Sequence, residues 1–265
     1  METETYQEIL RTVKRTLGID LTHYKDQQMR RRLDTYLLRS GIPSWADYLT
    51  RLKVDRTEQG RFRDFLTINV SSFFRDPDRW QGLQDGILPR LLQEALGRRL
   101  NGEIRLWSAG CSMGAEPYTL AILLAEMARG RHAYILATDL DRGVLAKARA
   151  GGPFKAEEVQ AFNNAQKISY FNPGAPPYFI RPFLTQRVTF REHNLLSDPF
   201  ERDFDLIVCR NVMIYFNPDA KNLLFREFHQ ALRPGGVLFL GGAEIIPFPH
   251  QLGFRSCGPS FYERV

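Results

Sequence analysis

The stretch that decides the fold runs from Arg105 to Leu124 and reads R-L-W-S-A-G-C-S-M-G-A-E-P-Y-T-L-A-I-L-L. Its first residues favour a strand, and the apolar run that follows Pro117 favours a helix. Between them, Gly110 and Gly114 allow a sharp turn and the close approach of a bound ligand. The stretch therefore predicts a buried strand, a glycine loop and a helix. Such a unit binds nucleotides at the carboxyl edge of α/β sheets.

The side chains of this loop narrow the kind of ligand. The spacing G-x-x-x-G matches neither the dinucleotide-binding G-x-G-x-x-G nor a P-loop, which needs Gly-Lys-Ser or Gly-Lys-Thr. Glu116, at the end of the loop, would repel a phosphate, but it suits a ligand that carries an amino group and no phosphate. S-adenosylmethionine is such a ligand. The alternative is a turn that only packs the strand against the helix.

Composition excludes several classes of protein. The 265 residues, 43% of them hydrophobic, are enough for one large domain or two small ones. No apolar run is long enough to span a membrane, and the acidic, polar N-terminus is not a secretory signal. Cys111, Cys209 and Cys257 lie far apart, which argues against a disulfide frame and a zinc site. We therefore expect a cytoplasmic protein with no metal ion and no direct membrane insertion.

The balance of charge is basic, with a net charge of +6 and a pI near 9.3. A solvated, arginine-rich surface would explain this balance. The alternative is an acidic partner, either a nucleic acid or an acidic protein surface. The five histidines form no recognisable cluster and are expected at the surface or in packing.

Residues 1–72 are predicted to be helical. Apolar residues at helical spacing indicate a first helix that ends at Gly18. A second helix is expected over residues 25–39 and ends at Gly41. Ser44 is a suitable N-cap for a third helix. These elements together predict a small all-α domain at the N-terminus.

The chain between this domain and the glycine loop contains two further helices and a polar loop. A fourth helix is expected over residues 61–68, followed by the loop T-I-N-V-S-S-F-F-R-D-P at residues 67–77. Residues 78–100 predict a helix whose buried face consists of Leu88, Leu91, Leu92 and Leu96. We therefore treat residues 73–100 as a linker and helix between two domains.

From residue 101 to residue 265, predicted strands and helices alternate, which is typical of a mostly parallel sheet covered by helices. After the opening strand, further strands are expected at residues 133–141, 188–190, 204–216 and 233–241, with a last antiparallel strand within 253–264. Residues 168–190 are rich in proline and aromatic residues and predict a small antiparallel β insert.

Asp139 ends the second predicted strand. In α/β folds that bind nucleosides, an acidic residue at this place accepts hydrogen bonds from the ribose hydroxyls. The alternative is that Asp139 caps the helix predicted over residues 142–150.

Taken together, these features resemble the CheR family of chemotaxis receptor methyltransferases. The matching segments stand in the family's order and at similar spacings over nearly the whole chain: T-I-N-V-S-S-F-F-R-D, W-S-A-G-C-S-M-G-A-E-P-Y-T-L-A, A-T-D-L-D, C-R-N-V-M-I-Y-F and L-R-P-G-G-V-L-F-L-G-G-A-E. The resemblance implies a Rossmann-like, class I S-adenosylmethionine-dependent methyltransferase fold behind an all-α domain. It also implies methylation of receptor glutamates to methyl esters.

The resemblance also assigns residues to the site. Glu116 would hold the amino group of the cofactor, and Asp139 would hold its ribose. Arg75 would orient the incoming carboxylate, and Tyr215 is a candidate neighbour of the methyl group, with a core aromatic as the alternative. The rest of the cofactor site would be formed by Asn69, Ser71, Arg75, Gly110, Asn194, Leu195, Arg210 and Asn211.

Two positions depart from the family's usual pattern. Ser71 replaces the usual Thr and keeps the hydroxyl. Ala115 replaces the first of two consecutive glutamates, so it is open which of the two glutamates binds the cofactor in the family. If the missing glutamate is the one that binds it, this chain would bind the cofactor weakly. The expected chemistry itself makes few demands, because a glutamate acceptor is already an anion at neutral pH and attacks a sulfonium methyl without a general base.

The expected partner is the acidic helical methylation region of a chemoreceptor. Arg30, Arg31 and Arg32 are the candidates for docking, with solvated arginines beside a helix core as the alternative. Because the insert at 168–190 is short and proline-rich, we expect no dependence on a receptor's C-terminal pentapeptide. We also expect a monomer that binds no nucleic acid.

Three rival functions stay open at this point. One is an S-adenosylmethionine methyltransferase of RNA or a small molecule, although no N-P-P-Y-type motif follows the fourth strand. Another is a CheR-like methyltransferase of a signalling pathway other than motility. The third is a non-catalytic regulator that binds the cofactor, which only Ala115 supports.

Overall fold

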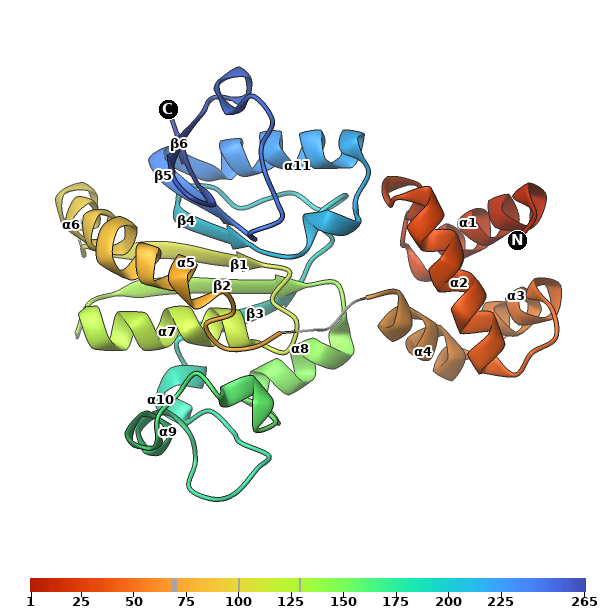
Figure 1. Cartoon of the computed structure of the whole chain (residues 1–265), viewed down its shortest axis with the longest axis horizontal. Helices are drawn as coiled ribbons and strands as arrows, with labels where there is room; N and C mark the ends of the chain where they lie inside the picture. Colours follow the sequence, from red (N-terminus) through yellow and green to blue (C-terminus); the bar gives the residue numbers. More distant parts are fainter. Residues whose placement is uncertain (68–70, 100, 129) are drawn as a thin grey trace. The chain divides into compact units, whose positions relative to one another are not determined.

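The computed structural model describes residues 1–67, 71–99, 101–128 and 130–265. The chain divides into two compact units (Figure 1). The first unit contains Met1–Ile68 and Tyr215–Asn222, and the second contains Asn69–Ile214 and Leu223–Val265. The first is built from helices, and the second is built around a sheet.

The N-terminal part of the first unit consists of helices α1 (Thr3–Leu17), α2 (Asp26–Ser40), α3 (Trp45–Val54) and α4 (Arg56–Leu66). Their apolar stripes face inward, as the spacing predicts. Gly18 and Gly41 end α1 and α2 with φ of 71° and 69°, in the left-handed region that glycine adopts without strain. The Ser44 hydroxyl accepts a hydrogen bond from the Asp47 amide (3.2 Å) at the start of α3. These three predicted helix ends are confirmed.

Helix α4 begins five residues before the predicted start at Arg61. The Asp55 carboxylate accepts a hydrogen bond from the Glu58 amide (3.0 Å) and so caps a helix that runs through Gly60. The reason lies in tertiary contacts. The buried Glu58 accepts hydrogen bonds from the Tyr36 and Tyr48 hydroxyls (2.6 and 3.0 Å), which holds the first turn of α4 in the core.

The second unit contains a seven-stranded sheet with the order β3-β2-β1-β4-β5-β7-β6. The strands are β1 (Ile104–Ala109), β2 (Ala133–Asp139), β3 (Val188–Glu192), β4 (Phe204–Cys209), β5 (Leu232–Leu240), β6 (Phe254–Gly258) and β7 (Phe261–Arg264). The first five pair in parallel, and β7 pairs antiparallel with both β5 and β6. The predicted class, a mostly parallel sheet behind an all-α part, is confirmed.

Helices cover both faces of this sheet (Figure 1). The helices that follow α4 are α5 (Pro77–Gly82), α6 (Leu88–Arg98), α7 (Ala115–Met127), α8 (Arg142–Arg149), α9 (Asn164–Tyr170), α10 (Pro182–Thr185) and α11 (Pro218–Ala231), and of these α9 and α10 lie away from the sheet. Successive side chains of β1 point to opposite faces. Leu106 lies in the core cluster that includes α7, whereas the Trp107 ring packs edge-on against Phe228 of α11, 5.6 Å between centroids. The carboxyl ends of the five parallel strands lie at one edge of the sheet, and the glycine loop between β1 and α7 lies at that edge.

The helix predicted over residues 78–100 is interrupted by a π-helical turn over Leu83–Ile87. Leu88, Leu91 and Leu92 are buried as predicted. The prediction for Leu96 is wrong, because its side chain is 46% exposed. Ala95 takes the buried place in the last turn. It lies seven residues after Leu88 and therefore on the same stripe, whereas Leu96 lies at the edge of that stripe.

Two regions of the second unit differ in detail from the prediction. The insert at 168–190 has antiparallel pairing only as the isolated bridges Phe154↔Tyr178 and Phe171↔Ile180, between short helices. The segment 253–264 forms two strands joined by a turn at Ser260, rather than one. Of the two, only β7 pairs with β5, and β6 pairs with β7. The Gly258-Pro259 dipeptide between them is a turn signal.

None of the helices among the described residues has the length and apolar character needed to cross a membrane.

Candidate active site

The glycine loop turns tightly between β1 and α7. The amides of Gly110 and Cys111 both donate to the Thr138 carbonyl of β2, at 2.8 and 2.9 Å. Gly110 has φ of 85°, and a Cβ there would lie 2.4 Å from a methyl group of Val212. The close neighbour that demands glycine is therefore a side chain from the loop after β4. Gly110 still stands at the edge where the predicted ligand would bind.

Asp139 connects this loop with the end of β2. Its two carboxylate oxygens accept hydrogen bonds from the amides of Ser112 (2.8 Å) and Asp141 (3.0 Å). The cap of α8 is Asp141 instead, whose carboxylate accepts from the amides of Gly143 and Val144 at 2.7 and 3.1 Å. A carboxylate has about four lone-pair sites, so each Asp139 oxygen can accept a further hydroxyl. Burial raises the pKa of Asp139.

Glu116 is the second residue of α7 and is partly buried. One oxygen accepts a hydrogen bond from the Ser108 hydroxyl at 2.7 Å. Among the described residues, the other oxygen accepts none. Burial raises the pKa of Glu116 to about 7, against the opposing effect of the positive charges of Arg210 and Arg75. The Glu116 carboxylate is therefore poorly solvated, and one of its oxygens can still accept a hydrogen bond from a ligand.

Arg210 follows β4 and lies buried beside this carboxylate. It donates to Asp76 at 2.6 Å, and its guanidinium lies over the rings of Phe239 and Trp80, 4.8 and 5.5 Å from their centroids. Its Nε is buried and has no hydrogen-bond partner in the described part of the chain. Burial lowers the pKa of Arg210, and the nearby carboxylates Glu116 and Asp76 oppose this. Such a guanidinium holds a positive charge in a region of low polarity.

Glu244 is a site residue that the sequence reasoning missed. Its carboxylate is buried and accepts hydrogen bonds from the amides of Asn211, Met213 and Gly241, at 2.8, 2.7 and 2.8 Å. Asn211 has φ of 59°, a left-handed conformation that this clamp holds in place. Glu244 thus joins the loop after β4 to the loop after β5. The sequence feature that could have revealed Glu244 is its position at the end of G-G-A-E, directly after an apolar strand.

The residues predicted to flank the adenine follow β3. The His193 amide donates to the Asp139 carbonyl at 3.0 Å, so this loop starts beside Asp139. The Asn194 side-chain oxygen accepts from the Leu196 amide at 3.0 Å and shapes a tight turn. Leu195 is partly exposed in that turn. The structure therefore brings together the loops after β1, β2 and β3, as the parallel sheet requires.

Four further predicted site residues remain to be placed. Asn69 lies outside the described residues. Ser71 and Arg75 are partly exposed in the segment before α5, next to the buried Phe73. Tyr215 belongs to the first unit, where its carbonyl accepts a hydrogen bond from the Lys25 amide at 3.0 Å.

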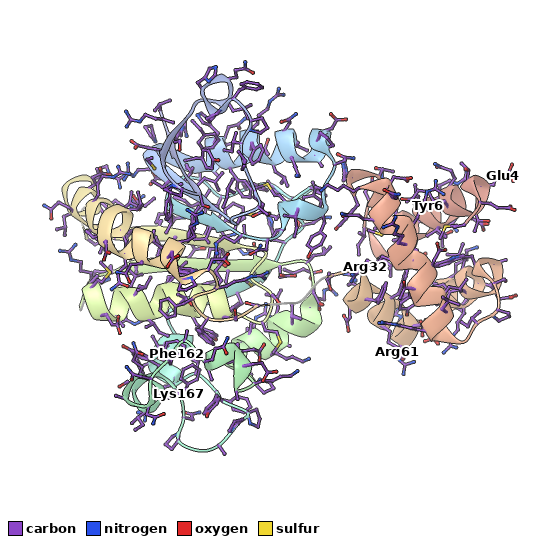
Figure 2. All side chains as sticks on the ribbon, viewed as in Figure 1. Glu4, Tyr6, Arg32, Arg61, Phe162 and Lys167 are labelled. Atoms are coloured by element: carbon purple, nitrogen blue, oxygen red, sulfur yellow. The ribbon has the colours of Figure 1, made fainter. Side chains whose placement is uncertain are left out.

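The three arginines of α2 differ from one another. Arg30 pairs with Asp26 (2.9 Å) and lies over the Tyr6 ring, 3.9 Å from its centroid. Arg32 is half-buried, where it donates to the carbonyls of Phe65 and Thr67 (Figure 2), and burial lowers its pKa. Arg31 is exposed. Arg30 and Arg32 are therefore both engaged in contacts inside the first unit.

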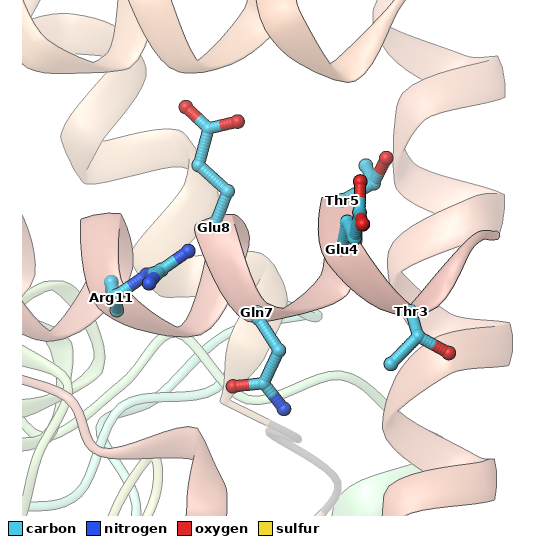
Figure 3. A pocket seen from close by; sticks show the side chains of 6 residues that line it. All are labelled: Thr3, Glu4, Thr5, Gln7, Glu8 and Arg11. Atoms are coloured by element: carbon cyan, nitrogen blue, oxygen red, sulfur yellow. The ribbon is translucent and has the colours of Figure 1, made fainter.

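A shallow depression on the surface of α1 is formed by side chains of that helix alone (Figure 3). It is lined by Thr3, Glu4, Thr5, Gln7, Glu8 and Arg11. Most of these side chains are exposed and carry charges of both signs. It has none of the buried acceptors that the glycine loop presents.

S-adenosylmethionine fits the residues that the glycine loop and its neighbours present. The cofactor carries an ammonium group, two ribose hydroxyls and a sulfonium charge. The site offers two carboxylates, Glu116 and Asp139, that each retain acceptor capacity. The amides of Gly110, Cys111 and Ser112 all donate within the protein, so these three do not serve a phosphate.

Comparison with known families shows to which family the chain belongs. The model of the CheR methyltransferase SAM-binding domain matches residues 69–261, and that of the CheR methyltransferase all-alpha domain matches residues 4–67.

The chain belongs to the CheR methyltransferase family.

Relatives that bear the name chemotaxis protein methyltransferase match nearly the whole chain. One from Listeria innocua is 40% identical over 257 residues, which cover 97% of this chain and 96% of the relative. One from Salmonella typhimurium is 34% identical over 250 residues, 90% of this chain and 83% of the relative. This CheR protein is therefore a methyltransferase that uses S-adenosylmethionine.

The departure at Ala115 lies in the core rather than at the site. Ala115 is fully buried in the apolar cluster that contains α7, whereas the Glu116 carboxylate reaches Ser108 and the charges of Arg210 and Arg75. Position 115 therefore packs in the apolar core, and Glu116 is the carboxylate that lies beside these charges.

Proposed function

We propose that the chain transfers a methyl group from S-adenosylmethionine to glutamate side chains on the cytoplasmic helices of a bacterial chemoreceptor. The methyl esters formed would serve sensory adaptation. The observation that carries the proposal is the match of both CheR family models, one to each end of the chain. Relatives named chemotaxis protein methyltransferase share almost their full length with it, which supports the same substrate class.

When bound, S-adenosylmethionine supplies a methyl group on a positively charged sulfur. Glu116 would hold the ammonium group through its unused oxygen, and its buried position would strengthen that ion pair. Asp139 would accept the ribose hydroxyls beside the two amides it already binds. The remaining pocket would be lined by Asn69, Ser71, Arg75, Gly110, Asn194, Leu195, Arg210 and Asn211.

The acceptor glutamate needs no general base, because its side chain is ionised at neutral pH with a pKa near 4.3. The protein's task is to align this carboxylate with the methyl group and to exclude water. Arg75 would orient the incoming carboxylate by its positive charge, and Tyr215 stays a candidate neighbour of the transferred methyl, with a core aromatic as the alternative. Arg210, which is paired with Asp76, would add a positive charge beside Glu116.

Docking of the receptor would use the exposed side of α2. Arg31 suits this role best of the three predicted arginines, because Arg30 pairs with Asp26 and Arg32 binds two carbonyls. An exposed guanidinium gains little from a partner unless the partner presents several carboxylates. The acidic face of a receptor's methylation helices offers such a field.

The enzyme would act as a monomer and without a receptor's C-terminal pentapeptide. An extended peptide binds most readily along an open strand edge. Residues 168–187 are all described and contain two isolated bridges but no strand. Binding of a tether-type pentapeptide at micromolar concentration would contradict this part of the proposal.

The test is methyl transfer from radiolabelled S-adenosylmethionine to purified cytoplasmic fragments of chemoreceptors. The expected product is a label on the fragment that is released by mild base, as glutamate methyl esters are. The same assay with fragments whose glutamates are replaced by alanine is the control. Binding of S-adenosylhomocysteine without transfer to any fragment would instead favour a regulator, and transfer to RNA would favour the nucleic-acid rival.

A further inference from the structure

Arg210 is a buried positive charge that depends on one ion pair. Its side chain is 3% exposed, and its guanidinium donates to the Asp76 carboxylate at 2.6 Å. Among the described residues, no other carboxylate lies within 4.0 Å of this guanidinium. The rings of Phe239 and Trp80 pack against it. Because a buried charge that loses its partner is strongly destabilising, Arg210 needs a carboxylate beside it.

Asp76 adopts a strained backbone conformation while it makes this contact. Its φ is 59° and its ψ is 69°, in the left-handed region, and it precedes Pro77. It stands at the N-cap of α5, where an aspartate side chain usually accepts a hydrogen bond from a backbone amide of the helix. Here the side chain makes no such bond, and the Asp76 carbonyl accepts from the Arg79 amide at 2.9 Å. The Asp76 carboxylate is therefore directed at Arg210 rather than at the helix.

Glu116 is a second carboxylate under the influence of Arg210. Burial raises the pKa of Glu116, and the positive charge of Arg210 is the strongest effect that opposes this rise. These two described side chains nevertheless form no ion pair, since Glu116 is bonded to Ser108 and Arg210 to Asp76. The other charged groups that act on both of them are Arg75 and Glu244. Glu244 already accepts hydrogen bonds from three backbone amides, so it is a poor replacement partner for Arg210.

We propose that Asp76 is a positioning residue, which holds the Arg210 guanidinium off Glu116 and so keeps one Glu116 oxygen available to the ammonium group of S-adenosylmethionine. The proposal rests on the proposed role of Glu116 in holding that group. Without the charge of Asp76, Glu116 is the carboxylate that acts most strongly on Arg210. A charge-assisted hydrogen bond between the two would occupy the oxygen that the ammonium group needs. The cofactor would then compete with a guanidinium of the protein itself.

The test is a calorimetric titration of Asp76→Asn with S-adenosylhomocysteine, which carries the same ammonium group, between pH 5.5 and 7.5. Asparagine keeps the size of the side chain and tolerates a left-handed backbone, but it binds a guanidinium less strongly than a carboxylate does. We expect an affinity at least tenfold below that of the wild type at pH 7.5. We also expect less than a threefold change over this pH range, because pairing with Arg210 would keep Glu116 ionised. The wild-type affinity should instead follow the protonation of Glu116, whose pKa is about 7.

Two comparisons isolate the effect. Asp78→Asn is the matched control, because Asp78 lies exposed in the first turn of α5 and the substitution is the same. This control should match the wild type in affinity and in pH dependence. The second comparison adds Asp76→Asn to Glu116→Gln. If Asp76 acts through Glu116, the added substitution should change the affinity less than twofold.

The outcomes separate this inference from the proposed function. Equal affinity and equal pH dependence in Asp76→Asn and the wild type would refute the inference and leave the proposed function standing. A loss of affinity that is the same at every pH, or that persists in the Glu116→Gln background, would mean that Asp76 only shapes the segment before α5, and would refute it too. Failure of Asp76→Asn to fold would also refute it, because Arg210 would have found no second carboxylate. If the wild-type affinity does not depend on pH, the role of Glu116 and this inference are both refuted, whereas methyl transfer to receptor fragments tests the proposed function separately.

Discussion

The ionisation of Glu116 should make cofactor binding depend on pH. Burial raises the pKa of Glu116 to about 7 in the ligand-free protein. Only the ionised form can pair with an ammonium group, so the carboxylate must lose its proton before or during binding. With a pKa of about 7, the ionised fraction falls from about three quarters at pH 7.5 to about 3% at pH 5.5.

This fraction sets the size of the effect. The affinity for S-adenosylhomocysteine should fall about 25-fold between pH 7.5 and 5.5, which corresponds to about 2 kcal/mol. Near pH 6.5, binding should release a proton from the protein. Isothermal titration calorimetry in two buffers of different ionisation enthalpy measures both the affinity and the number of protons released.

The control is Glu116→Gln, which keeps the size of the side chain and removes its titration. This variant should bind more weakly than the wild type at pH 7.5, with little dependence on pH. Because the folded protein holds a proton that the unfolded chain has released above pH 4.5, the wild type should also lose stability as pH rises towards 7. The Glu116→Gln variant should show no such loss of stability. An equal slope of affinity against pH in both proteins, or no slope in the wild type, would refute this role of Glu116.

Three further predictions concern other parts of the molecule. Asp139→Ala should weaken S-adenosylhomocysteine binding at least tenfold in the same calorimetric assay, and unchanged affinity would mean that Asp139 only holds the loop amides. Arg31→Glu should lower the rate of receptor methylation several-fold with unchanged cofactor affinity, whereas equal loss of both would indicate a structural role for α2. Glu244→Ala should lower the free energy of unfolding by about 2–4 kcal/mol in urea titrations, since it leaves three buried amides without an acceptor; a loss below 1 kcal/mol would show that water replaces the carboxylate.

Much of this protein is determined by sequence over short distances. The stretch from Arg105 to Leu124 specifies a strand, a tight turn and a helix, because strand formers, glycines and an apolar run act on their own backbone. Gly18, Gly41 and Ser44 end or begin helices for the same local reason. Alternating strands and helices then require a parallel sheet, and a parallel sheet brings the loops after β1, β2 and β3 to one edge.

Other features depend on residues far apart in the chain, so no local pattern reveals them. Asp139 and Asp141 both follow β2, and only the folded structure assigns the helix cap to Asp141 and the loop amides to Asp139. Gly110 needs glycine because Val212, a hundred residues later, occupies the space of its Cβ. Glu244 could be recognised as a clamp only once β4 and β5 were neighbours. Sequence thus determined the elements and their order through backbone preferences and periodicity, whereas the tertiary structure decided which side chain meets which, because those contacts form only when distant segments pack together.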